Sequence, residues 1–547
     1  MLSCQEYIIS PKTRGGKSMT AEQYLQKQNE ALQKLQKKRA EASWKASTTG
    51  EDEWNRKTAE AQTEVSLYLS DSERFREVKE FLESGELNQL EQRQLQLLKN
   101  SMVKNQLDAD VLKELSERSS ELVGVFNTYR AVLDGREVSE NDIRKILTDS
   151  KDNELRERAW HASKTIGSKV EKKLIDLVKL RNETAMKLGY RNFHEMSFEL
   201  QELDRDVIFA IFDELKKISD EPFHQLKREM DEEIAERLSI SIDEIRPWHY
   251  ADPFFQEAPP SKALNLDSYY EGKNLEELTA ATFASMGMEI GDMLENSDLY
   301  PREKKNQHAF CTDIDREGDV RVLCNNSSSD YWSTTMLHEF GHAVYFKYID
   351  RDLPFLLRAP AHTLTTEAIA MLYGRMGRNP EWLGKFLGIN EQELKELAGE
   401  LKLALRRQML ISARWFITFS LFEKELYENP DQDLNRLWWK IVKEVQFLNP
   451  PENQDIPHWA AKIHFTLVPV YYQNYLLGEL TTSQLEQHIK KNLKGDILSK
   501  EAGSYLLEEF FKPGAALHWN EKIEKATGEK LNPQHFIDQF VGDLQQA

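Results

Sequence analysis

Proline is absent from residues 12 to 221, and the glycines of that stretch are few and scattered. Proline breaks helices, and turns between strands are rich in proline and glycine, so this composition favours long helices over strands. The stretch 20–150 is rich in Glu, Gln and Lys, which predicts amphipathic helices with solvated charged faces. The capping-box sequence at 20–23 places the start of the first helix just after Met19. Residues 1–18 lack periodicity and are expected to form a loose tail.

Composition narrows the function classes. The formal net charge is −20 and there is no dense Lys/Arg tract, so nucleic acid and anionic membranes are poor partners. No apolar run approaches 18 residues and the first 18 residues lack an apolar core, which argues against a membrane span and secretion. The cysteines Cys4, Cys311 and Cys324 are too few for a disulfide framework, and we expect reduced thiols. These features predict a cytoplasmic protein.

The sequence pattern changes at two places near the middle of the chain. Four prolines between residues 247 and 262 indicate a long ordered loop between two lobes. Residues 309–314 and 320–324 then form the best hairpin signal, around a turn at 315–319. An edge strand of such a hairpin can bind an extended peptide through main-chain hydrogen bonds. A small hairpin with a purely structural role is the alternative.

The segment His338-Glu339-Phe340-Gly341-His342 carries the strongest chemical signal. Two histidines four residues apart lie on one helix face, with Cβ atoms about 5–6 Å apart. That spacing lets both imidazoles bind one tetrahedral zinc ion. Glu339 lies beside them, where it can take a proton from a water molecule on the zinc. The alternative is a pair of surface histidines on an amphipathic helix.

A third zinc ligand must come from elsewhere in the chain. The metzincin pattern is excluded, because tyrosines stand at 345 and 348 where that pattern needs Gly and His. Asp350 and Asp352 are too near the end of the first helix to fold back easily. His362 and Glu367 therefore remain as candidates.

Of these two candidates, Glu367 is favoured over His362. It lies in 365–372, which is expected to begin a second helix, and Pro354 and Pro360 interrupt the chain between the two helices. Two crossing helices would supply three ligands and leave the fourth position open to water. That layout is typical of a catalytic zinc site with one Zn²⁺ per chain.

A second cluster follows near the C-terminus, from Lys462 to Tyr475. Pro469 suits the first turn of a helix, which would place Tyr472 and Tyr475 one turn apart on the same face. Tyrosine hydroxyls and the N–H of His464 can stabilise the oxyanion formed when a peptide bond is hydrolysed. An aromatic core stripe with a satisfied histidine is the alternative.

Taken together, these segments resemble the peptidyl-dipeptidases of the angiotensin-converting-enzyme family of gluzincins, from about residue 20 onward. The resemblance rests on the zinc helix, the link after it, the ligand helix and two N-terminal segments, namely 338–342, 352–354 with 357–358, 367–369, 41–44, and 180–185 with 189–190. It implies a peptidase whose zinc ligands are His338, His342 and Glu367 and whose general base is Glu339.

The resemblance also implies substrate-binding residues. His308-Ala309 matches the family's substrate-binding strand, and Lys462 matches the lysine that binds the substrate's C-terminal carboxylate. Gln256 falls loosely where the family has a carboxylate-binding glutamine. His464 matches the oxyanion histidine, while Tyr472 and Tyr475 keep the spacing of the two functional tyrosines.

Several positions depart from that family. An ungapped match would select Tyr471 and put Asn474 at the oxyanion tyrosine, so we accept a one-residue shift that favours Tyr472 for substrate binding and Tyr475 for catalysis. Glu367 is also one residue further from His342 than in that family's usual spacing. In both shifts the chain is similar to the thimet-oligopeptidase-like family. An arginine of the family is replaced here, which argues against chloride activation. Met371 replaces an acidic residue behind the zinc ligands, so the support of the ligands must be built differently.

The sequence therefore predicts an almost wholly α-helical, two-lobed ellipsoid with a deep cleft and one small sheet near the zinc site. Residues 19–547 would form a single peptidase domain, with its zinc core at about 300–480. The expected function is a metallopeptidase that acts on short peptides and releases C-terminal dipeptides, with no obligate protein partner. A thimet-like endo-oligopeptidase and an inactive helical peptide-binding scaffold are the alternatives.

Overall fold

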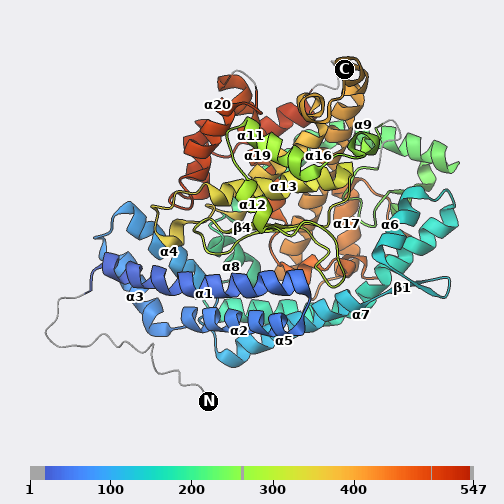
Figure 1. Cartoon of the computed structure of the whole chain (residues 1–547). Coiled ribbons are helices and arrows are strands. Elements are labelled where there is room, and N and C mark those ends of the chain that lie inside the picture. The colour runs from blue at the N-terminus through green and yellow to red at the C-terminus, as the bar shows by residue number, and fades with distance from the viewer. Residues whose placement is uncertain (1–18, 260–263, 494–495, 543–547) are drawn as a thin grey trace.

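The computed structural model describes residues 19–259, 264–493 and 496–542. The predicted tail at 1–18 and Cys4 lie outside these residues. The described chain is helical apart from two small antiparallel hairpins (Figure 1), which confirms the nearly all-α fold. No helix within these ranges combines the length and the apolar character needed to cross a membrane.

The N-terminal part is a series of helices, as the lack of proline predicts. It comprises α1 (Ala21–Thr49), α2 (Asp52–Leu69), α3 (Ser72–Ser84), α4 (Gln89–Val103), α5 (Ala109–Thr128), α6 (Glu140–Asp149), α7 (Asn153–Lys187), α8 (Phe193–Leu200) and α9 (Arg205–Leu238). Helix α1 begins with the expected capping box, in which the Thr20 hydroxyl accepts from the Gln23 N–H and the Gln23 side chain accepts from the Thr20 N–H. The predicted start of the first helix is therefore confirmed.

One hairpin interrupts this helical stretch, and here the prediction of helices alone is wrong. Strands β1 (Ala131–Leu133) and β2 (Arg136–Val138) pair antiparallel around Asp134-Gly135. Both turn residues have positive φ, 51° and 80°, as a two-residue hairpin turn requires. The Asp-Gly pair was the available sequence signal.

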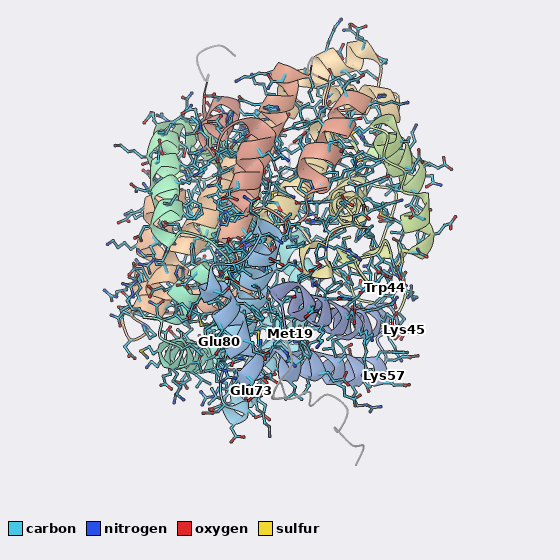
Figure 2. All side chains as sticks on the ribbon, turned by 90° about the vertical axis from the view of Figure 1, so that its left-hand side faces the viewer. Met19, Trp44, Lys45, Lys57, Glu73 and Glu80 are labelled. Atoms are coloured by element: carbon cyan, nitrogen blue, oxygen red, sulfur yellow. The ribbon has the colours of Figure 1, made fainter. Side chains whose placement is uncertain are left out.

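Helices α1 to α4 enclose a small hydrophobic cluster of their own, which also takes in Phe355 and Leu356. Helices α1 and α2 run side by side along the lower edge of the molecule (Figure 1). Lys45 of α1 and Lys57 of α2 are labelled in Figure 2. The ammonium groups of both lysines lie over the Trp54 ring. The division of the whole chain into two lobes around a deep cleft stays a prediction.

The rest of the described chain completes the main hydrophobic core, to which α5 to α9 also contribute. It comprises α10 (Asp267–Tyr270), α11 (Leu275–Ser285), α12 (Gly291–Asn296), β3 (Phe310–Asp313), β4 (Val320–Leu323), α13 (Asp330–Lys347), α14 (Thr363–Gly374), α15 (Pro380–Trp382), α16 (Glu391–Glu428), α17 (Leu434–Gln446), α18 (His464–Leu467), α19 (Gln473–Asn492), α20 (Lys500–Tyr505), α21 (Trp519–Thr527) and α22 (Gln534–Phe536). The hairpin predicted at 309–324 is confirmed as β3–β4, with Phe310 opposite Leu323.

Two glycines set the spacing of the helices α13, α14 and α19. A Cβ atom on Gly341 of α13 would lie 2.8 Å from Ala370 Cα of α14, closer than packed atoms allow. A Cβ atom on Gly478 of α19 would lie 3.1 Å from Glu367 Cβ of α14. The Thr482 hydroxyl, also on α19, donates to the Ala368 carbonyl of α14 at 2.8 Å. Helix α14 is therefore held closely between α13 and α19.

Replacing Gly341 with alanine should separate α13 from α14. We expect Gly341→Ala to lower the free energy of unfolding by about 1–3 kcal/mol, because the added methyl group meets backbone. Gly399→Ala is the matched control: Gly399 is an exposed residue inside α16 with open space around it, so alanine there should raise stability by up to about 1 kcal/mol. Thermal unfolding midpoints of the two variants measure this, and equal shifts would contradict the close helix crossing.

Candidate active site

Helix α13 carries the two histidines and the glutamate of the HExxH segment. The helix begins after Ser329, whose hydroxyl accepts from the Trp332 N–H. The rings of His338 and His342 lie 5.0 Å apart between centroids and nearly perpendicular, at 87°. Glu339 is 8% exposed on the same helix.

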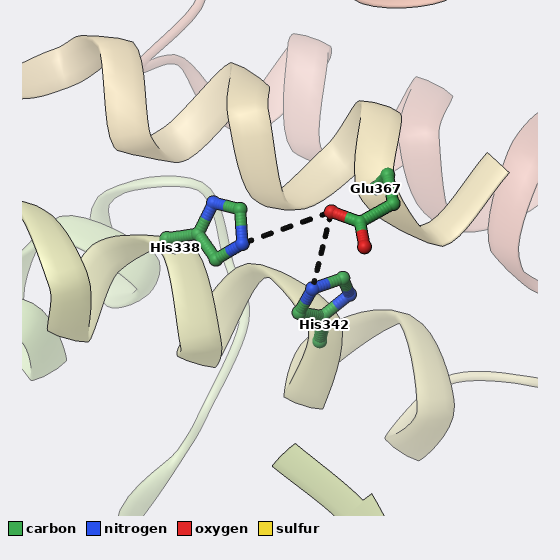
Figure 3. Close-up of side chains that lie close together, drawn as sticks. All are labelled: His338, His342 and Glu367. Atoms are coloured by element: carbon green, nitrogen blue, oxygen red, sulfur yellow. Dashed lines mark ion pairs between the residues drawn. The ribbon is translucent and has the colours of Figure 1, made fainter. Parts of the chain in front are cut away.

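Glu367 of α14 faces both histidines (Figure 3). Its Oε2 atom lies 3.8 Å from His338 Nε2 and 3.8 Å from His342 Nε2. The three potential ligand atoms lie within 4.8 Å of one another. The alternative ligand, His362, caps the N-terminus of α14 instead, where its Nδ1 accepts from the Leu364 N–H at 3.0 Å. The structure thus brings Glu367, and not His362, to the histidine pair.

The three side chains fit a zinc ion. Glu367 Oε2 is buried and makes no hydrogen bond with any residue that the structure describes. Tetrahedral zinc with bonds of 2.0–2.1 Å needs ligand atoms roughly 3.3–3.5 Å apart, slightly less than the 3.8 Å seen here. The Thr366 hydroxyl lies 2.7 Å from His342 Nδ1 and fixes that ring with Nε2 toward Glu367. A small contraction would therefore complete the coordination of one zinc ion.

Burial sets the charge of this site. It lowers the pKa of His338 to about 4, and burial together with the neighbouring His338 lowers that of His342 well below its ordinary value, so both imidazoles are neutral at pH 7, as metal ligands must be. It raises the pKa of Glu367 to about 7, and burial together with Glu367 raises the pKa of Glu339 to about 8. Two buried carboxylates with raised pKa values and neutral neighbours are the environment that a divalent cation stabilises.

Tyr471 supports Glu367, which the sequence analysis did not foresee. Its hydroxyl donates to Glu367 Oε1 at 3.1 Å, and so fixes the oxygen that does not face the histidines. Burial, followed by the charge of Glu367, raises the pKa of Tyr471 and keeps the hydroxyl protonated. This contact supplies ligand support where Met371 cannot. The ungapped match to the family pointed to Tyr471 and was the available signal.

The other two tyrosines lie beside it in different surroundings. The Tyr475 ring is half-buried and lies 5.2 Å from the Tyr471 ring, and the charges of Glu367 and Glu339 add to burial in raising its pKa. Tyr472 is buried, stacked on Phe419 with ring centroids 3.9 Å apart. Their respective roles in catalysis and substrate binding stay predictions.

The helix that carries Tyr475 begins later than predicted, and Tyr472 is its N-cap. Pro469 was expected in its first turn, but α19 begins at Gln473. The chain turns at Val470, which has a φ of 55° and donates its N–H to the buried Glu423 carboxylate at 2.9 Å. That buried acceptor outweighs the preference of Pro469 for a helix start. The rings of Tyr472 and Tyr475 are nevertheless 5.4 Å apart.

His464 lies beside Tyr472, with ring centroids 5.0 Å apart, and strand β3 packs against α13. Burial lowers the pKa of His464 to about 3, with contributions from Lys462 and His308, so these three residues are neighbours. His308 and Ala309 directly precede β3, with His308 exposed. Strand β3 pairs with β4 only, so its second edge has no strand partner among the described ranges. Glu339, after burial, raises the pKa of Cys311, which places β3 beside the general base.

Lys462 meets Gln256, which the resemblance matched only loosely. Lys462 Nζ donates to Gln256 Oε1 at 2.7 Å, although the two residues are far apart in the sequence. Burial lowers the pKa of Lys462 to about 8, against the charges of Asp252 and Glu257. The pair offers an ammonium group and a side-chain amide at one place.

Comparison with known protein families agrees with this geometry. A sequence model of peptidase family M3 matches residues 146–542. The chain belongs to peptidase family M3. A model of angiotensin-converting enzyme also matches residues 16–237. Both families are zinc-dependent, and the mixed resemblance expected from the sequence is confirmed.

Similar proteins carry several descriptions. The "Inactive angiotensin-converting enzyme-related protein" of Caenorhabditis elegans is 22% identical over 73% of this chain and 49% of its own length. The "Angiotensin-converting enzyme-related protein" of Drosophila melanogaster is 24% identical over 50% of the chain and 46% of its own. "Thermostable carboxypeptidase 1" of Pyrococcus furiosus is 22% identical over 78% of the chain and 83% of its own. The matches to the first two relatives thus span about half of their length.

Variants of the residues at this family M3 site should differ in their affinity for zinc. Glu367→Gln should weaken zinc binding by an order of magnitude or more, since a neutral amide is a poor ligand. Tyr471→Phe should weaken it about 10–100-fold through the lost hydrogen bond to Glu367. Tyr472→Phe, which removes a hydroxyl from the same segment, serves as the control and should retain zinc. Competition with a chromophoric chelator measures the three affinities, and full retention in Glu367→Gln with loss in His362→Ala would refute the ligand set.

Proposed function

We propose that this protein is a zinc metallopeptidase that hydrolyses short peptides. The observation that carries the proposal is the buried Oε2 atom of Glu367, which has no hydrogen-bond partner in the described part of the chain and lies 3.8 Å from each of two neutral imidazoles. Glu339 is next in sequence to His338. Membership of family M3 supports the reaction class. One zinc ion per chain is expected.

His338, His342 and Glu367 would hold the metal and leave one position open. Zinc bound there supplies a Lewis acid for the peptide carbonyl and lowers the pKa of a water molecule. Glu339 would accept a proton from the attacking water and pass it to the leaving amine. A bound cation would offset the burial that raises the pKa of Glu339, and so keep its carboxylate free to accept that proton.

The attack on the carbonyl creates an oxyanion that needs hydrogen-bond donors. Tyr475 can serve because its raised pKa keeps the hydroxyl protonated at neutral pH. His464 is neutral, with a pKa of about 3, so it has one ring N–H to donate. Its Nδ1 is buried without a hydrogen-bond partner among the described residues. The ring N–H of this neutral imidazole would donate to the oxyanion.

We further propose that the enzyme releases C-terminal dipeptides. A substrate would extend along the open edge of β3 next to His308 and Ala309, with Tyr472 lining the site. Lys462 and Gln256 would bind its terminal carboxylate and so fix the distance between the cut and the end of the peptide. A thimet-like endo-oligopeptidase would lack this dependence on the terminus.

An inactive peptide-binding scaffold is the candidate from a different class, and one relative is described as inactive. The complete set of ligands and Glu339 favour an enzyme here, because a binding scaffold has no use for a buried general base. We also propose that the protein acts in the cytoplasm without an obligate protein partner.

Removal of the general base should separate metal binding from activity. We expect Glu339→Gln to retain zinc and to lose turnover by at least ~10²–10⁴-fold, because the water then has no proton acceptor. Glu295→Gln, which changes an exposed acid on α12, controls for the loss of a charge. Zinc content and the rate of peptide cleavage are the two measurements. Normal turnover in zinc-loaded Glu339→Gln would disprove the mechanism.

The form of the substrate's C-terminus should decide its cleavage. A charge-assisted hydrogen bond to Lys462 contributes about 1.5–3 kcal/mol, so free-acid peptides should be cleaved roughly 10–100-fold more efficiently than amidated ones. Lys462→Met keeps the apolar stem and should erase the difference. Mass spectrometry identifies the products. Equal rates on both forms, with products other than dipeptides, would favour the endo-oligopeptidase.

A further inference from the structure

The loop that carries Gln256 is wrapped around a buried carboxylate. Asp252 is 1% exposed, and its two oxygens accept three backbone N–H groups from within the loop. The donors are Phe254 at 2.9 Å, Gln256 at 3.2 and 3.1 Å, and Glu257 at 3.1 Å. One side chain therefore fixes the backbone on both sides of Gln256.

Side chains from outside the loop also hold its backbone through hydrogen bonds. The Trp160 indole N–H donates to the Pro253 carbonyl at 3.0 Å, and the Gln446 amide donates to the Phe255 carbonyl at 2.8 Å. Phe255 is buried with a φ of 51°, a conformation that a bulky residue adopts only when its surroundings impose it. The loop thus has one well-defined shape, and that shape directs the Gln256 side chain to Lys462.

Asp252 also acts on two buried lysines. Lys164 and Lys462 both lie over the Phe254 ring, with Nζ 3.0 Å and 5.2 Å from its centroid. Burial lowers the pKa of both lysines, that of Lys164 well below its ordinary value and that of Lys462 to about 8, and the charge of Asp252 acts against this lowering. Lys462, which also meets Gln256, is therefore the lysine that keeps a positive charge for a substrate carboxylate.

We propose that Asp252 is a positioning residue that prepares the Lys462–Gln256 pair to bind the C-terminal carboxylate of a peptide. This inference rests on the proposed function, since it assigns the residue that makes the anchor work. Asp252 fixes the place of the Gln256 amide through the backbone and supplies the negative charge that keeps Lys462 protonated. Without it, the Gln256 amide would lose its fixed place and Lys462 would lose the negative charge that opposes the effect of burial.

The test measures peptide binding in zinc-loaded Glu339→Gln protein, so that no substrate is consumed. The quantity is the ratio of dissociation constants for an amidated peptide and its free acid, from calorimetry between pH 6 and 9. We expect a ratio of about 10–100 at pH 6.5. The ratio should fall as the pH rises through about 8, because Lys462 is charged only below its pKa. Besides Asp252, the charged or titratable groups around Lys462 are Lys164, Glu140, Arg144, Glu257 and His464.

Adding Asp252→Asn should reduce the ratio at pH 6.5 at least about fivefold and move its fall to lower pH. Glu257→Gln is the matched control. It removes a carboxylate that also acts on Lys462, but this side chain is 46% exposed, pairs with Arg144 and accepts no bond from the loop. Its ratio at pH 6.5 should stay within about twofold of the parent.

A second variant covers the case in which Asp252→Asn does not fold. Asp252→Glu keeps the negative charge but, with its longer side chain, cannot keep all three bonds to the loop N–H groups, so the ratio at pH 6.5 should fall while its pH midpoint stays near 8. No discrimination between the two peptides in the parent protein would refute the anchor in the proposed function itself. A parent that discriminates, with an unchanged ratio and pH midpoint in Asp252→Asn or an unchanged ratio in Asp252→Glu, would overturn the role of Asp252 alone.

Discussion

The close approach of α13, α14 and α19 is the constraint on which the rest of the site depends. Gly341 and Gly478 leave out the side-chain atoms that would hold these helices apart. Only at this spacing can the short side chain of Glu367 reach both histidines of the neighbouring helix. The site is therefore built by backbone packing in the core, which is also why it lies on rigid elements.

Burial shifts the pKa values of the side chains at two places, the metal centre and the Lys462 anchor. At the metal centre it makes two histidines neutral and raises the pKa values of two carboxylates, so that the site favours a cation. At the Lys462 anchor it lowers the pKa of Lys462, the nearby Asp252 carboxylate opposes this lowering, and the protonated Lys462 favours an anion. A peptide between them would meet positive charge at its C-terminal carboxylate and acid–base chemistry at the peptide bond.

The elements that could be predicted from the sequence are those whose signals are local. The capping box at Thr20, the β3–β4 hairpin and the helical spacing of His338 and His342 each depend on residues a few positions apart. The start of α19 was missed because the buried Glu423 carboxylate, distant in sequence, binds the Val470 N–H. The β1–β2 hairpin departs from the prediction although its Asp134-Gly135 turn is a local signal. A lack of proline does not exclude such a hairpin, because its two-residue turn needs residues with positive φ and no proline.

The sequence by itself determined the fold class, the HExxH chemistry and the choice between a few third ligands, because periodicity and side-chain type are properties of the chain. The tertiary structure decided which side chains meet. It placed Tyr471 on Glu367, Gln256 on Lys462, and Asp252 within the loop between them. These contacts join residues from separate elements, and they depend on helix spacing and loop shape that no local pattern records.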